Sequence, residues 1–159
     1  MSASVTESRL TRLFEKLKEK DRAALVTFIT ANDPNPELFR QLLEGMPTAG
    51  ADIIELGMPF SDPMADGPSI QLSSQRALKA GVTIDDVLGA VKRMRELEMD
   101  TPIILMGYYN PIYRYGPAEF AQAAANAGVD GRYCTCDVWL GSGRIVANIC
   151  IVSRCRPLH

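Results

Sequence analysis

Short apolar runs alternate with amphipathic segments along the first 131 residues of the chain. Three runs rich in β-branched or aliphatic side chains predict buried strands at residues 24–30, 52–56 and 103–109. Residues 129–131 have the composition of the start of a fourth strand. The intervening segments, with apolar residues at helical spacing or with helix start and stop signals, predict helices. These helices are expected at residues 6–20, 34 or 36 to 44, 68–80, 84–98 and 117–127, with a loop at 110–116.

Two of the expected helices begin with recognisable capping residues. Asp33 and Asn35 are each followed by a proline, and either can cap a helix whose first position tolerates proline. Thr83, with Asp86 three residues later, has the pattern of a capping box.

The strand pattern favours a parallel α/β fold. The runs lack polar alternation and each is followed by a helix, which is typical of a parallel sheet covered on its faces. A doubly wound sheet and a βα barrel both fit, but no G-x-G-x-x-G follows a strand, so the nucleotide-binding fingerprint is absent. A barrel needs about 250 residues and eight strands. The chain is therefore predicted to be an open sheet or a barrel cut near its middle.

Composition divides the chain in two. The net charge of −2 and the absence of a basic stripe argue against a nucleic-acid partner. No apolar run approaches the roughly 20 residues of a membrane span, and the polar N-terminus has no signal-peptide core, so we expect a cytoplasmic protein. Residues 1–131 hold 13 basic and 18 acidic side chains, whereas residues 132–159 hold four arginines, one acid, all four cysteines and the only Trp and His. We therefore predict a boundary at residue 131.

The strongest candidate for a functional site is the segment ELGMPFSDPMADGP at residues 55–68. Glu55 lies near the end of the second strand, and the loop that follows carries Asp62 and Asp66. A parallel α/β protein presents acid/base groups to a ligand at such strand ends. Plainer roles are also open, because Glu55 can cap a strand or pair with a lysine, and the two aspartates can bond to backbone N–H groups of the loop. A calcium loop is excluded, since Met64 occupies the third ligand position and no Glu falls at the twelfth.

Several ordered motifs resemble the tryptophan synthase alpha chain family. The motifs are VTFITANDP, AGADIIELG, ELGMPFSDPMADGP, IQLSSQRALKAG, GVTIDDVL, PIILMGYYNPIYRYG and AGVD, within about residues 8–131. The resemblance implies the N-terminal half of a (β/α)8 TIM barrel, truncated after the start of the fourth strand. It also implies a lyase of tryptophan biosynthesis that cleaves indole-3-glycerol phosphate to indole and glyceraldehyde 3-phosphate.

The resemblance also implies roles for individual residues. Glu55 matches the acid/base glutamate of the ELG motif, and Asp66 matches the aspartate that assists at the indole nitrogen. Phe28 and Tyr108 match positions that line the indole pocket, although aromatic residues at strand ends are often plain core. No metal is expected.

The family's partner is the beta chain, in assemblies of two alpha with two beta chains. The beta chain uses pyridoxal phosphate, so no cofactor is expected in this chain. Pro59, Asp62, Asn110 and Pro111 match loops that face the beta chain, although Asn110–Pro111 can also be a simple turn.

The tail at residues 132–159 departs from the family pattern. Three interpretations of this tail are open. It is the product of a change of reading frame or a read-through intron, it is a small zinc site, or it is a real variant tail that docks on the open sheet. The zinc site would use Cys134, Cys136, Cys150, Cys155 and His159. The half of the family barrel without a counterpart here holds the phosphate-binding glycines. We therefore expect little or no lyase activity and a tendency to aggregate, or a non-catalytic fragment that retains only the docking surface for the beta chain.

Overall fold

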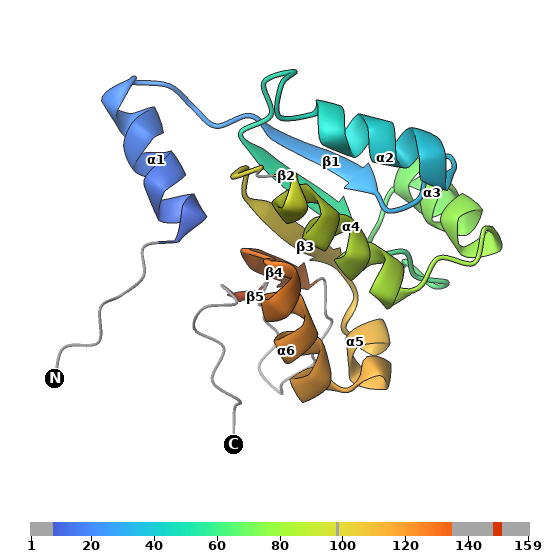
Figure 1. Ribbon diagram of the computed structural model, residues 1–159. Coiled ribbons are helices and arrows are strands. Elements are labelled where there is room, and N and C mark those ends of the chain that lie inside the picture. Colours follow the sequence, from blue (N-terminus) through green and yellow to red (C-terminus); the bar gives the residue numbers. More distant parts are fainter. Residues whose placement is uncertain (1–7, 98, 135–147, 151–159) are drawn as a thin grey trace, which may run out of the picture.

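A computed structural model describes residues 8–97, 99–134 and 148–150 (Figure 1). The five strands form one sheet in the order β1-β2-β3-β4-β5, in which β1 to β4 are parallel and β5 is antiparallel to β4. The elements are α1 (Arg9–Glu19), β1 (Val26–Thr30), α2 (Pro36–Gly45), β2 (Ile53–Gly57), α3 (Pro68–Lys79), α4 (Ile84–Glu96), β3 (Ile103–Gly107), α5 (Tyr109–Tyr115), α6 (Pro117–Ala127), β4 (Gly131–Cys134) and β5 (Asn148–Cys150). The predicted parallel α/β fold is confirmed.

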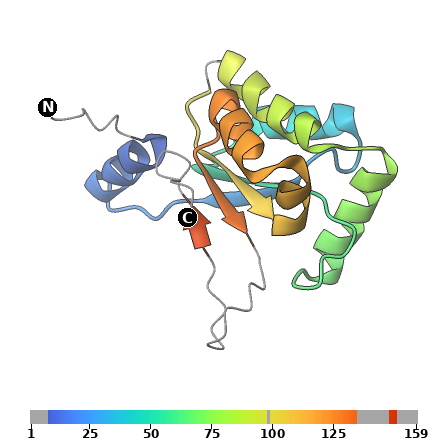
Figure 2. The same ribbon diagram turned by 90° about the horizontal axis from the view of Figure 1, so that it is seen from below.

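The hydrophobic core lies between the sheet and the helices α2, α4 and α6, which cover one face of it (Figure 2). Alternate residues of β1, β2 and β3 point into this layer because successive side chains of a strand face opposite sides. The central strands contribute Ile54, Leu56, Ile103 and Leu105, all fully buried. The helices contribute Phe39, Leu43, Val87, Val91, Met94, Phe120 and Ala124.

The opposite face of the sheet is more open. Its middle row is Phe28, Glu55 and Ile104, which are in register across β1, β2 and β3 and are only half-buried. Val26, on the same face at the start of β1, is 46% exposed. Apolar side chains on this face are thus left partly in contact with solvent, as expected for part of a barrel.

Both predicted capping signals are present at helix starts. The Asn35 side chain accepts a hydrogen bond from the Leu38 N–H at 2.9 Å, so Asn35 rather than Asp33 caps α2. Thr83 and Asp86 form the reciprocal capping box at the start of α4. The sequence therefore located the start of α4 to the residue, and the structure decides between the two caps that the sequence left open for α2.

The predicted loop at residues 110–116 was wrong. The structure has helix α5 at Tyr109–Tyr115, and Asn110–Pro111 lie in its first turn rather than in a simple turn. Proline is tolerated there because the first N–H groups of a helix have no partner within the helix. The helix is held by the fully buried Ile112 and by Tyr115, whose ring packs edge-on against Phe120 with centroids 6.1 Å apart.

An ionic network fastens α1 to the amino ends of the strands. The Asp130 carboxylate, just before β4, accepts hydrogen bonds from Arg95 at 2.7 Å, from Arg9 at 3.1 Å and from the Ile103 backbone N–H at 2.9 Å. Its side chain is 4% exposed. Asp100 is more exposed and also binds Arg9. This network leaves the carboxyl ends of the strands free for the candidate site.

Part of the tail lies against the sheet. In β5, Cys150 is in register with Arg132 of β4 and Asn148 with Cys134. A variant tail that docks on the open sheet would make such a contact. Whether the tail arose from a change of reading frame stays a prediction. Of the proposed zinc ligands, Cys136, Cys155 and His159 lie outside the described residues.

Candidate functional site

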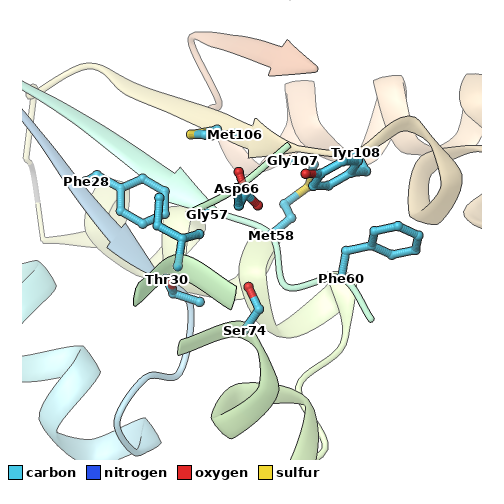
Figure 3. A pocket seen from close by; sticks show the side chains of 11 residues that line it. Phe28, Thr30, Gly57, Met58, Phe60, Asp66, Ser74, Met106, Gly107 and Tyr108 are labelled. Atoms are coloured by element: carbon cyan, nitrogen blue, oxygen red, sulfur yellow. The ribbon is translucent and has the colours of Figure 1, made fainter. Parts of the chain in front are cut away.

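The loops that follow β2 and β3 enclose a small pocket at the carboxyl ends of β1, β2 and β3 (Figure 3). Phe28, Asp66 and Tyr108 line it, and Asp66 lies between the two aromatic rings in this view. The pocket volume is about 10 Å³, which is room for about one water molecule. The other lining residues are Thr30, Gly57, Met58, Phe60, Ile70, Ser74, Met106 and Gly107.

Two glycines at the strand ends shape the pocket. A Cβ added to Gly57 would lie 2.7 Å from the Phe28 ring, so only the absence of a side chain lets that ring extend over the end of β2. A Cβ added to Gly107 would lie 2.9 Å from the Met58 methyl group, which packs across the end of β3 in the same way. The glycine at the end of each strand therefore makes room for one wall of the pocket.

Asp66 and Tyr108 interact across the pocket. Burial raises the pKa of the Asp66 carboxyl above its ordinary value, and a side-chain hydrogen bond with Tyr108 opposes part of this rise. The Tyr108 hydroxyl also accepts a hydrogen bond from the backbone N–H of Ala65 at 2.8 Å. Phe60, from the same loop as Asp66, packs against Tyr108 with ring centroids 5.1 Å apart. Tyr108 therefore contacts the loop through both its ring and its hydroxyl.

Glu55 lies on the same face of the sheet as the pocket but does not line it. The strand register places it between Phe28 and Ile104, one row closer to the amino ends of the strands than Thr30, Gly57 and Met106. Its side chain is half-buried, and within the described part of the chain no hydrogen bond or ion pair engages its carboxyl. The structure thus brings Phe28, Asp66 and Tyr108 together and leaves Glu55 beside them.

The four residues predicted to contact a partner line a second, larger cavity. Pro59, Asp62, Asn110 and Pro111 surround a volume of about 490 Å³ between the loop after β2, the start of α4 and the start of α5. The Asp62 carboxylate accepts a hydrogen bond from the neighbouring Ser61 hydroxyl at 2.5 Å. Asp62 and Asp66 therefore face different cavities although only four positions separate them.

Sequence reasoning missed some lining residues. Thr30 and Ser73 form a buried hydroxyl–hydroxyl hydrogen bond of 2.7 Å, which joins the end of β1 to α3 beneath the pocket. Thr30 is the last residue of its strand and shares a row with Gly57. Its position at the end of a predicted strand, level with Gly57, is the signal that could have identified Thr30 as a lining residue. Phe60 had no such signal, because its place depends on the path of a loop.

The comparisons with known proteins identify the family. A sequence model described as tryptophan synthase alpha chain matches residues 14–138. This chain belongs to the tryptophan synthase alpha chain family. A tryptophan synthase alpha subunit of Legionella pneumophila is 49% identical, with a TM-score of 0.76, over 79% of this chain and 48% of that one. A protein of Aquifex aeolicus is 39% identical, with a TM-score of 0.77, over 80% and 50%. Tryptophan synthase of Mycobacterium tuberculosis is 35% identical, with a TM-score of 0.74, over 79% and 49%.

This chain spans about half the length of these relatives. Its four parallel strands and alternating helices form the first half of their barrel, as predicted. The family match ends at residue 138, beyond the predicted boundary at 131 and past the end of β4. Among the described residues, no helix is long and apolar enough to cross a membrane.

Proposed function

We propose that the carboxyl ends of β1, β2 and β3 form the indole-binding half of a lyase site that acts on indole-3-glycerol phosphate. One observation supports this most directly: the aromatic residues Phe28 and Tyr108 and the carboxyl of Asp66 line one pocket at these strand ends. A flat aromatic ligand with one N–H group matches two aromatic walls and one carboxylate acceptor.

The proposed reaction is a retro-aldol cleavage. A proton is added to the indole ring carbon that carries the glycerol phosphate, and the ring becomes positively charged. The bond to the glycerol carbon then breaks, its electron pair restores the ring, and the hydroxyl on that carbon loses its proton to become the aldehyde. Asp66 would stabilise the positive charge by accepting a hydrogen bond from the ring N–H.

Glu55 is the proposed acid/base group of this reaction. Its half-buried side chain is on the face of β2 that carries the pocket, in register with Phe28. Substrate that extends from the pocket over this face would bring its reacting carbon toward the carboxyl. A positioned acid/base group of this kind typically contributes about 100- to 10,000-fold to the rate.

The second cavity is the proposed contact surface for a beta chain. Its loops project from the same end of the sheet as the pocket. The structure of the Mycobacterium tuberculosis relative is a structure of tryptophan synthase. We propose that pyridoxal phosphate belongs to the beta chain and that this chain holds no cofactor. Two alpha and two beta chains would form the assembly.

We propose that the 159-residue chain alone has little lyase activity. The half of the barrel that carries the family's phosphate-binding glycines has no counterpart in the match, and positioning of substrate by a phosphate site typically contributes several kcal/mol. A non-catalytic role in docking to the beta chain is the second candidate, supported by the gathering of Pro59, Asp62, Asn110 and Pro111 around one cavity.

Two measurements on the purified chain test these proposals. The first is the rate of indole release from indole-3-glycerol phosphate, with and without a beta chain. We expect release far below that of a full-length relative, and a further fall of about 100-fold or more in Glu55→Gln. The second is capture of a beta chain, which should be equal for the wild type and Glu55→Gln.

The matched control is Glu15→Gln, which removes an exposed carboxylate on α1. It should leave both measurements unchanged. Release at the rate of a full-length relative would contradict the proposed low activity, and release unaffected by Glu55→Gln would contradict the role of Glu55. Failure to capture the beta chain would contradict the docking surface.

A further inference from the structure

The loop that carries Asp66 closes the pocket in this structure. The pocket has room for about one water molecule, which is far less than a two-ring ligand needs. Phe60 and Asp66, both lining residues, belong to the segment 58–67 between β2 and α3. A two-ring ligand therefore needs the walls of the pocket, of which this segment is one, to move apart.

The base of this segment is tied to α3 within the same βα unit. The Gln71 side-chain amide donates to the backbone carbonyl of Asp66 at 2.8 Å and to that of Pro63 at 3.4 Å. The Met64 side chain, at the tip of the segment, is 88% exposed and so provides little packing to hold it. These contacts hold the end of the loop that leads into α3, but they do not connect the loop to the wall of the pocket that follows β3.

Tyr108 provides the connection to the far wall. It follows β3, belongs to the next βα unit, and its hydroxyl accepts the backbone N–H of Ala65, the residue directly before Asp66. A hydroxyl can accept one hydrogen bond and donate another, so the same oxygen can hold the Ala65 N–H and donate its proton to a carboxylate. The Phe60 ring packs on the Tyr108 ring and adds an apolar contact to the same closure.

We propose that the Tyr108 hydroxyl is a positioning group that latches the Asp66-bearing loop in its closed position by accepting the Ala65 N–H. The Tyr108 ring remains a wall of the pocket, and the hydroxyl has this separate task. In the reaction proposed above, on which the use of this role rests, the latch would keep the Asp66 carboxyl at the strand ends, where it can accept a hydrogen bond from the indole N–H.

The test is Tyr108→Phe, which removes one oxygen and keeps the ring. Hydrogen exchange at the Ala65 amide should become about fivefold faster, the effect of losing one neutral hydrogen bond. The pKa of the Asp66 carboxyl, followed by NMR, should rise further above its ordinary value, because the hydrogen bond that opposes the rise is gone. A residue that only fills space would leave both readings unchanged in this isosteric variant.

The matched control is Tyr113→Phe, which removes the hydroxyl of a tyrosine that is 70% exposed on α5. It should change neither reading. Unchanged exchange at Ala65 and an unchanged Asp66 titration in Tyr108→Phe would overturn the proposal. If Tyr108→Phe does not fold, hydrogen exchange in the wild type decides. An Ala65 amide that exchanges as fast as the amide of the exposed Ser61 would also overturn the proposal.

These readings need no substrate, so they separate the latch from the proposed function. If both readings change as expected but the wild type does not bind indole, the latch is supported and the lyase assignment fails. If indole binds to the wild type and both readings are unchanged in Tyr108→Phe, the assignment is supported and the latch fails.

Discussion

Replacing Asp130 with alanine should be among the most destabilising single changes in the chain. Its buried carboxylate joins Arg95, Arg9 and the Ile103 backbone N–H, and so connects α4, α1 and the start of β3. In Asp130→Ala, the Ile103 N–H loses its partner, which costs about 1–3 kcal/mol. The Arg95 side chain, 13% exposed, is left without its counter-charge.

The size of the effect follows from what remains around Arg95. Breaking a buried ion pair typically costs about 3–5 kcal/mol. The guanidinium still donates to the backbone carbonyls of Gly128, Met99 and Thr101, so we expect the lower end, about 3–4 kcal/mol in total. Asp130→Asn should cost less, about 1–2 kcal/mol, because one oxygen can still accept from both Arg95 and Ile103.

Urea unfolding followed by circular dichroism gives the free energy of unfolding for each variant. Asp100→Ala is the matched control, since it removes an aspartate that also pairs with Arg9 but is 66% exposed. It should cost less than about 1 kcal/mol. An Asp130→Ala variant as stable as Asp100→Ala would refute the reasoning that burial makes this carboxylate important.

Two further changes concern the pocket. Gly57→Ala should cost about 1–3 kcal/mol and displace the Phe28 ring, because the new methyl group would meet that ring at 2.7 Å; the unfolding free energy and the indole affinity report both effects. Asp66→Asn should gain stability relative to the wild type as the pH rises from about 4 to about 7. Burial raises the pKa of Asp66 in the folded state, so the folded wild type loses stability as this group ionises, and the amide does not.

Gly89→Ala is the control for Gly57→Ala, since a Cβ at this position in α4 meets nothing within 4 Å. Alanine favours the helix there, so stability should rise by about 0.5–1 kcal/mol. An equal gain in Gly57→Ala would show that the ring does not need the glycine. For Asp66→Asn, stability curves that run parallel to the wild type across this pH range would contradict the assigned burial of the carboxyl.

The fold was largely predictable because its local signals agree with one another. Continuous apolar runs marked three buried strands, and Asn35 and the Thr83 capping box marked helix starts. Helix α5 was not predicted, because a proline and three tyrosines in seven residues give no strong helical pattern. What forms that helix is burial of Ile112 and contact of Tyr115 with α6, which only the tertiary structure provides.

The candidate site was predictable only in part. Family motifs indicated Phe28, Asp66 and Tyr108, and the structure brings these three together. The bond between Tyr108 and the Ala65 N–H could not be predicted, since it joins a side chain to a backbone group 43 positions away and depends on the path of a loop. The register that places Glu55 beside the pocket, rather than in its wall, likewise requires the paired strands.

Titration of the isotopically labelled chain with indole, followed by NMR, tests the central claim most directly. We predict saturable shifts at the amides of Gly57, Ala65 and Gly107 around the pocket, and an affinity about tenfold weaker in Asp66→Asn, which loses a charge-assisted hydrogen bond. Asp62→Asn, in the neighbouring cavity, should bind as the wild type does. Saturable shifts confined to another part of the chain, or equal affinity in Asp66→Asn, would contradict the claim that this pocket binds the indole ring.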